Sequence, residues 1–230
     1  MPIVYATALP AFSPPAEEAA LRPLCARWER AAAPRLSPAQ RAHCRRFHSG
    51  GGALRARASR LLARLLALRA LPEGAALDMD AQGRPLVTDA PGWQAAFTHS
   101  GSAAFCLICG PGEAWGESPV SMALDAEAWG APPPGDRAFA APTPTQAASL
   151  RRWVLAEVLF KALGAPPACW TAVAVAAHAG AGRRQGIWQA DGARLGWRVL
   201  AAPGHLLCTA LPGAAVPRLR LCWLHWKVLA

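Results

Sequence analysis

Two pairs of charged residues in this chain are spaced so that each pair shares one face of its secondary-structure element. Asp125 and Glu127 lie two apart in a strand-like segment, and the two-residue period of a strand directs both side chains to one face. Glu157 and Lys161 lie four apart in a predicted helix and also share a face. Close carboxylates repel unless a cation separates them, and Mg2+ is usually held by carboxylates together with substrate phosphates. On spacing alone, an exposed strand end and an ordinary surface ion pair remain the simpler interpretations.

A histidine between two hydroxyl residues is a further candidate for chemistry. Thr98, His99 and Ser100 precede Gly101, and we expect residues 99–101 to form a tight turn between two strands. A phosphate could approach side chains and backbone N–H groups at such a turn, although a lone histidine there is more often structural. The sequence has no P-loop, no GxGxxG after a strand, no GxSxG and no HExxH. Nucleotide chemistry through these common motifs is therefore disfavoured.

Positive charge is concentrated in the first third of the chain. The net charge of +10 comes from 22 arginines and only 2 lysines against 14 acidic residues. Between Arg22 and Arg69 there are 12 arginines and one carboxylate, Glu29. A region of one sign attracts anions such as a nucleotide, a nucleic acid, an acidic lipid surface or an acidic protein. The alternative is a solvated arginine face without a partner.

Helices and short strands must position these residues. Ser37-Pro38 has the form of a helix start, with serine as N-cap and proline in the first turn. Residues 54–71 give the strongest helical pattern, since leucines recur at helical spacing between arginines. We interpret it as a core helix with an arginine rim rather than a membrane-surface helix. The other expected elements are a hairpin at 77–88, helices at 18–33 and 145–163, and strands at 3–8, 96–98, 103–109, 119–126, 171–177, 186–189, 196–200 and 205–210.

Both halves of the chain run from helix to short strands, although no repeat of identical residues is found. This order predicts an α+β fold of two similar lobes joined near residues 110–118. We place the N-terminal lobe at 1–115, with the basic region, and the C-terminal lobe at 116–230, with the acids. Trp223 and Trp226 are expected to dock the C-terminal tail.

Composition argues for a globular cytoplasmic protein. Hydrophobic residues make up 53% of the chain and charged residues 17%, which is enough to form a sizeable core. No apolar stretch approaches the ~20 residues of a membrane span, and the N-terminus lacks the basic region of a signal peptide. Cys106 and Cys109 lie three apart in a strand-like run, so they face opposite ways and are poorly placed to share a metal. We expect the seven cysteines to be free thiols in a reducing compartment.

Three ordered blocks resemble the signature of the surfactin-synthetase type of 4'-phosphopantetheinyl transferases. Gly83-Arg84-Pro85, followed by Thr98-His99-Ser100, is similar to the family's GKP or GRP turn and its SHS triplet. Residues 123–127 are similar to the family's GIDIE or GVDVE block, with both acids kept and Ala123 in place of glycine. Residues 153–161 are similar to WxxKExxxK, with Ala156 in place of the first lysine.

The resemblance also includes the basic region formed by the stretch from Leu36 to Phe47 and by Arg55 and Arg64, and it spans roughly residues 35–210. It implies two similar α+β lobes in a monomer, with the active site in the cleft between them. It also implies transfer of the phosphopantetheine arm of coenzyme A to a serine of an acidic acyl or peptidyl carrier protein, with release of 3',5'-adenosine bisphosphate. Fatty-acid, polyketide and nonribosomal-peptide synthesis are the pathways that such carriers serve.

The resemblance assigns roles to individual residues. Asp125, Glu127 and Glu157 would hold Mg2+, or Mn2+, against the diphosphate of coenzyme A. Glu157 would also be the base for the carrier serine, and Lys161 and His99 would complete the catalytic set. The residues that would contact coenzyme A are Arg45, Arg46, Arg55, Arg84, Thr98, His99 and Lys161.

Two other interpretations compete with this one. A basic nucleic-acid-binding protein would explain the arginines and would lose affinity steeply with salt, but it leaves Asp125, Glu127 and Glu157 without a role. A family member that has lost catalysis and only binds carrier protein or coenzyme A would explain Ala123 and Ala156. We expect the transferase, with neither nucleic acid nor a membrane as partner.

Overall fold

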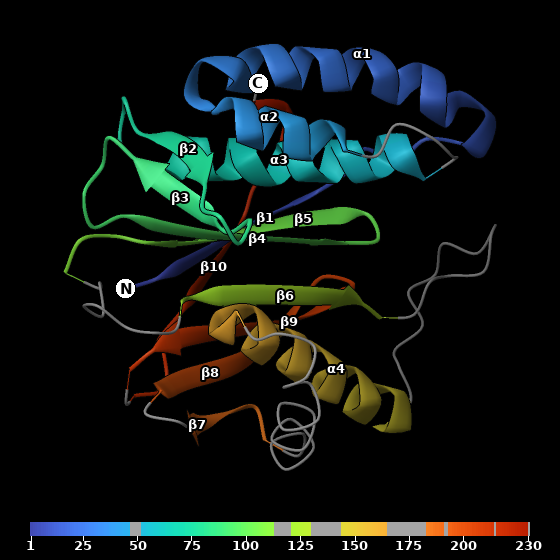
Figure 1. Cartoon of the computed structure of the whole chain (residues 1–230). Helices are drawn as coiled ribbons and strands as arrows, with labels where there is room; N and C mark the ends of the chain where they lie inside the picture. The colour runs from blue at the N-terminus through green and yellow to red at the C-terminus, as the bar shows by residue number, and fades with distance from the viewer. Residues whose placement is uncertain are drawn as a thin grey trace. The chain divides into compact units, whose positions relative to one another are not determined.

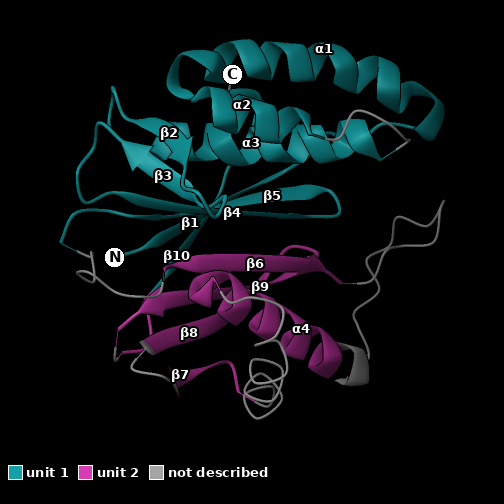
Figure 2. Cartoon of the chain, viewed as in Figure 1, with its two compact units in different colours: residues 1–114, 219–230 teal, residues 115–218 magenta. Residues whose placement is uncertain are grey.

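The computed structural model describes residues 1–46, 52–112, 121–129, 144–164, 183–190, 193–213 and 215–229. The fold is mixed α+β, as expected, and it divides into two compact units (Figure 2). Unit 1 comprises Met1–Ala114 and Leu219–Ala230, and unit 2 comprises Trp115–Arg218. The expected division had assigned all of 116–230 to one lobe, whereas the last segment clusters with the N-terminal part of the chain. The similarity of the two lobes stays a prediction.

Unit 1 is a four-stranded sheet covered on one face by helices (Figure 1). The strand order is β10-β1-β5-β4, with β1 antiparallel to β5 and parallel to β10. Leucines of α3 are buried against this sheet. They form the apolar stripe from which the helix was predicted, and the sheet is what covers that stripe. The bounds are β1 Ile3–Ala8, α1 Pro14–Ala32, η1 Ala33–Arg35, α2 Pro38–Arg45, α3 Ala53–Ala70, β4 Gln94–Ser100, β5 Ala103–Cys109, β10 Arg220–Trp223 and η3 Trp226–Leu229.

Local chemistry explains two boundaries in unit 1. The Ser37 hydroxyl accepts a hydrogen bond from the Gln40 N–H at 3.2 Å, which confirms Ser37 as the N-cap of α2. The predicted hairpin is also confirmed, with β2 (Ala76–Met79) antiparallel to β3 (Pro85–Thr88). Gly83 has φ +81° in the connecting turn, a conformation that glycine adopts without strain.

The C-terminal segment belongs to unit 1. Strand β10 pairs in parallel with β1, and Trp223 packs edge-on against Phe105 with ring centres 6.2 Å apart. Trp226 makes a similar edge contact with Trp28 at 6.0 Å. The expectation that these two tryptophans dock the tail is therefore confirmed.

Unit 2 is an antiparallel sheet with one described helix packed on it (Figure 1). The strand order is β6-β9-β8-β7, and α4 contacts β6 and β9. Gly164 follows α4 with φ +58°, consistent with the predicted helix end. The expected strand at 171–177 lies outside the described residues. The bounds are β6 Ala123–Ala128, α4 Pro144–Leu163, β7 Gln185–Ala190, β8 Ala193–Ala202 and β9 His205–Pro212.

The described cysteines are free thiols. Cys106 and Cys109 are both buried on β5, and Cys106 alone of this pair belongs to the helix-covered core, in agreement with opposite orientations. Burial raises the pKa of the Cys25 thiol to about 11 and that of Cys106 well above its ordinary value, so both stay protonated near neutral pH. No helix among the described residues has the length and apolar character that crossing a membrane requires.

Replacing Gly196 by alanine is expected to destabilise unit 2. A Cβ at this position in β8 would collide with the carbonyl oxygen of Ala215, so the backbone would have to move. We expect Gly196→Ala to lower the free energy of unfolding by about 3 kcal/mol in urea titrations. The matched control is Gly110→Ala, where the nearest atoms would be Trp93 ring carbons at 3.6 Å. Equal stability of the two variants would contradict the close approach.

Candidate active site

The two predicted acids of β6 face helix α4. Asp125 pairs with Cys208 and Glu127 with Leu206 on strand β9, and both of these partners lie in the core beneath α4. Directly paired residues of neighbouring strands point to the same side of a sheet. Asp125 and Glu127 therefore share the face on which α4 packs, as their two-residue spacing predicted.

Helix α4 presents a matching stripe to these acids. Trp153, Glu157 and Lys161 recur every four residues and so lie along one side of the helix. The Lys161 ammonium donates to Asp125 Oδ1 at 2.5 Å, and the Trp153 indole N–H donates to Glu127 Oε1 at 3.2 Å. Each carboxylate of β6 is thus held by a donor from the facing helix.

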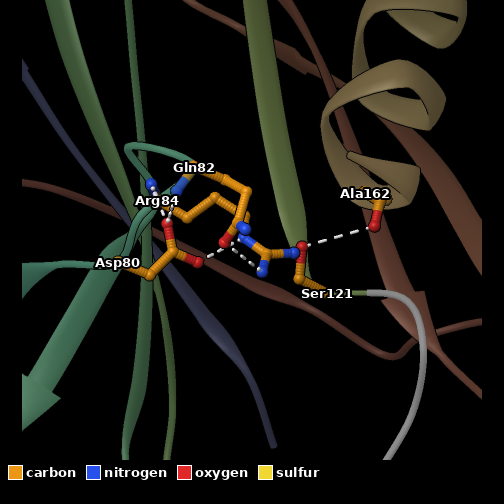
Figure 3. Close-up of polar contacts among 5 residues, drawn as sticks. All are labelled: Asp80, Gln82, Arg84, Ser121 and Ala162. Atoms are coloured by element: carbon orange, nitrogen blue, oxygen red, sulfur yellow. Dashed lines mark hydrogen bonds and ion pairs between the residues drawn. The ribbon is translucent and has the colours of Figure 1, made fainter. Parts of the chain in front are cut away.

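A further contact ties the end of α4 to the segment before β6. The backbone N–H and the hydroxyl of Ser121 both donate to the carbonyl of Ala162, at 2.8 and 3.3 Å. Figure 3 shows the hydroxyl contact. This carbonyl lies in the last turn of α4, where no intrahelical donor is available. The two bonds therefore help to fix the helix lengthwise against β6.

Asp125 is an electrostatically strained carboxyl. It is only 5% exposed, and this burial raises its pKa. Attraction to Lys161 and the hydrogen bond from it lower the pKa, while repulsion from Glu157 and Glu127 raises it, and the result is a pKa of about 6. Glu127 and Glu157 therefore both act on Asp125, and Lys161 is the cation that offsets this repulsion.

The donor set fits a hard divalent ion in chemistry, because carboxylate oxygens are the ligands that Mg2+ and Mn2+ prefer. Within the described ranges, however, no group of three or more His, Cys, Asp or Glu side chains is arranged to hold a metal. Asp125 and Glu127 are held by Lys161 and Trp153 instead. A metal at this site would thus require these side chains to rearrange.

Two departures from the family pattern fall in the core of unit 2. Ala123 is 3% exposed at the start of β6, and Ala156 is 5% exposed on α4. Both belong to the cluster between the helix and the sheet. The position where the family has its first lysine therefore carries a small side chain that fills core space.

In unit 1, Arg84 is paired within its own hairpin (Figure 3). Its Nε donates to Asp80 Oδ2 at 2.6 Å, and its backbone N–H donates to Asp80 Oδ1 at 2.8 Å. Burial tends to raise the pKa of Asp80, but these hydrogen bonds outweigh it and hold the pKa below its ordinary value. Asp80 therefore stays ionised and orients the Arg84 side chain.

The predicted turn at residues 99–101 is wrong in its position. Strand β4 continues through Ser100, and the turn to β5 is formed by Gly101 and Ser102. His99 shares a face with Phe97, which packs against the helix-covered core, whereas Thr98 and Ser100 point to the other face. A ligand lying on one face of β4 would meet either the imidazole or the two hydroxyls.

The arginines predicted to bind coenzyme A differ in their partners. Arg55 forms an ion pair with Glu17, and Arg45 Nε lies 3.2 Å from Glu29, which also binds Arg57 at 2.6 Å. For Arg46, which is exposed, no ion pair is found within the described part of the chain.

Arginines of the predicted basic region surround His43, a residue for which we predicted no role. Burial, together with repulsion from Arg64, Arg60 and Arg46, lowers the pKa of His43 to about 4. Arg64 is buried, donates to Gln40 at 3.0 Å and stacks over the Phe97 ring at 4.5 Å. The spacing of four between Arg60 and Arg64 on one helix face could have signalled this cluster.

A scan against models of known protein families finds no match, and a search of curated proteins finds none either.

Introducing the family's lysine at position 156 is expected to destabilise the chain. The new ammonium would have to enter the core between α4 and the sheet, where it would lose its hydration and crowd its neighbours. We expect Ala156→Lys to lower the free energy of unfolding by about 3 kcal/mol in urea titrations. Ser149→Lys, at an exposed position of the same helix, is the control and should change it by less than about 0.5 kcal/mol. A stable Ala156→Lys protein would show that this face of α4 is open.

Stability should respond to pH through Asp125. Because its pKa is about 6 rather than the ordinary 3.8, the folded state holds a proton that the unfolded state has lost in this range. Stability is therefore lost as pH rises from 4 towards 6. We expect Asp125→Asn to remove this loss, so its stability relative to wild type should shift upwards by about 1–3 kcal/mol between pH 4 and 7. Urea titrations at each pH measure this shift, and parallel profiles for the two proteins would refute the raised pKa.

Proposed function

We propose that this protein transfers the 4'-phosphopantetheine arm of coenzyme A to a serine of an acyl or peptidyl carrier protein. One observation carries the proposal. Two acidic residues of strand β6 face helix α4, which contributes the carboxylate of Glu157 and the ammonium of Lys161. Asp125 and Glu127 lie beneath α4, with Lys161 on Asp125 and Trp153 on Glu127. The ordered sequence blocks that resemble the transferase family contain these same residues.

Asp125, Glu127 and Glu157 would hold Mg2+, or Mn2+, in this proposal. When bound, the metal would offset charge on the diphosphate and on the leaving group. The repulsion that Glu127 and Glu157 exert on Asp125 supports the assignment, because a dicationic ligand relieves it. Lys161, at the end of the same stripe, would contact a phosphate.

Residues of unit 1 would bind the remainder of coenzyme A. Arg84 would contact the diphosphate, oriented by Asp80, while the roles of Thr98 and His99 rest on the family resemblance alone. Arg46 and Arg55, with Arg45, would serve the 3'-phosphate end. The pair of Arg45 with Glu29 is exposed enough, at 53% for Arg45, that a phosphate could compete for the guanidinium at little cost. The finer picture of two similar lobes with the active site between them is part of this proposal.

The chemical step transfers one phosphoryl-linked group. Glu157, directly or through a water, would accept the proton of the carrier serine as its oxygen forms a bond to the β-phosphorus of coenzyme A. The bond from that phosphorus to the bridging oxygen breaks at the same centre, and 3',5'-adenosine bisphosphate leaves with that oxygen. Preorganised cations around the phosphates would stabilise the charge that develops.

The proposed protein partner is acidic. A chain with a net charge of +10 attracts an acidic carrier protein over long range and so raises the association rate. We further propose that the enzyme acts as a monomer in the cytoplasm. The free thiols of the described cysteines support a reducing compartment.

Transfer can be tested by intact-mass spectrometry of apo carrier proteins incubated with this protein, coenzyme A and Mg2+. We expect a metal-dependent gain of one phosphopantetheine arm. Asp125→Ala should lower the rate by about 100-fold or more, because a ligand to the diphosphate-bound metal is lost. Glu73→Ala, which removes an exposed carboxylate of unit 1, is the control and should keep full activity.

Each other outcome has a definite meaning in this assay. Full activity of Asp125→Ala would remove Asp125 from the site. Binding of coenzyme A without transfer to any acyl or peptidyl carrier would favour a family member that has lost catalysis. Absence of both binding and transfer would overturn the proposal.

A further inference from the structure

We propose that Lys161 is a built-in counter-ion of the acidic site, and that its ammonium leaves Asp125 when a divalent cation binds there. This inference rests on the proposed function for the presence of the metal. The inference gives Lys161 a role in the substrate-free protein, where its ammonium contacts the Asp125 carboxylate in place of the metal.

The first step of the argument is the need for a cation. Asp125 is 5% exposed and lies within range of repulsion from both Glu127 and Glu157. An ionised carboxylate in such surroundings is costly unless it is paired. Lys161 supplies the pairing charge, with Nζ at 2.5 Å from Oδ1.

The second step is that Lys161 and a metal compete for the same oxygens. A magnesium ion binds carboxylate oxygens at about 2.1 Å, so it would occupy the side of Asp125 that the ammonium now contacts. Two cations sharing one carboxylate would also repel each other. Binding of the metal therefore favours release of the lysine.

The third step is that Lys161 has somewhere to go. Its side chain is 38% exposed, while that of Asp125 is 6% exposed, so the ammonium can move towards solvent without opening the core. The lysine ammonium is carried by a flexible four-carbon stem, which allows this movement without a shift of α4. Once released, the ammonium is available to an anionic ligand, so metal binding should strengthen binding of a phosphate at the same site.

A purely structural ion pair would behave differently. If Lys161 served only to fasten α4 to β6, its ammonium would stay on Asp125 whatever the metal concentration. The two roles can therefore be distinguished by observing the lysine itself.

The chain makes this observation simple because Lys161 and Lys227 are its only lysines. Protein labelled with 13C at the lysine ε-carbon should give two ε-CH2 correlations in an NMR spectrum, assigned through Lys227→Arg. Lys227 belongs to unit 1, where its ammonium lies 5.8 Å from the centre of the Trp226 ring, and it serves as the internal control. We expect titration with Mg2+ to shift the Lys161 signal and leave the Lys227 signal in place. In Asp125→Asn, Mg2+ should move neither signal.

Metal affinity provides a second readout. Mn2+ binding followed by electron paramagnetic resonance at pH 8, without substrate, should be about tenfold tighter in Lys161→Met than in wild type, because the competing cation is gone. Lys227→Met should stay within about twofold of wild type. If Lys161 only fastened α4 to β6, its replacement would disturb the acidic site and weaken Mn2+ binding. Tighter binding in Lys161→Met therefore supports the exchange of lysine for metal, and weaker or equal binding overturns it.

The outcomes separate this inference from the proposed function. If phosphopantetheine is transferred but the NMR signal of Lys161 does not shift with Mg2+, the exchange of lysine for metal is overturned and the proposed function is retained. A Lys161 signal that responds to Mg2+ without any transfer to carrier proteins would support the exchange and overturn the function. Failure of Mn2+ to bind would overturn both the exchange and the assigned metal ligands.

Discussion

The ion pair between Lys161 and Asp125 is the interaction on which the organisation of unit 2 depends. A carboxyl that is 5% exposed, with two other carboxylates acting on it, destabilises the folded chain unless a cation is held against it. The cation has to come from α4, since the helix packs directly on the strand that carries Asp125. Register between helix and strand is therefore constrained by charge as well as by packing.

Packing sets the same register independently. Val154, Val158 and Ala162, each one residue after the polar stripe, bury the adjacent side of the helix against the sheet. Ser121 donates to the carbonyl of Ala162 at the end of α4. A helix held at its apolar face and at its end presents its polar edge in only one position. Polar and apolar contacts thus favour one arrangement, which suits a site whose donors must be held closely.

The arginines of unit 1 also form ion pairs with nearby carboxylates, but these pairs are more exposed than that of Lys161 with Asp125. Arg55, Arg45 and Arg84 are each bound to an acid of their own unit, so the basic region is partly neutralised before any anion arrives. Half-exposed pairs of this kind contribute at most about 1 kcal/mol, and a multiply charged phosphate can replace them. Around His43, by contrast, burial and the repulsion of nearby arginines of α2 and α3 together depress the pKa of the imidazole.

Periodicity predicted the faces of the site but not its pairings. The two-residue period placed Asp125 with Glu127, and the helical period placed Glu157 with Lys161, because such relations depend only on local backbone geometry. The contact of Lys161 with Asp125 joins residues 36 apart in sequence and depends on which strand the helix covers. The turn after β4 was misplaced because Gly101 can end either turn, whereas β-pairing of His99 with Ala104 decides between them. Relations within one element can thus be predicted from sequence. Contacts between elements, such as that of Lys161 with Asp125, require the structure.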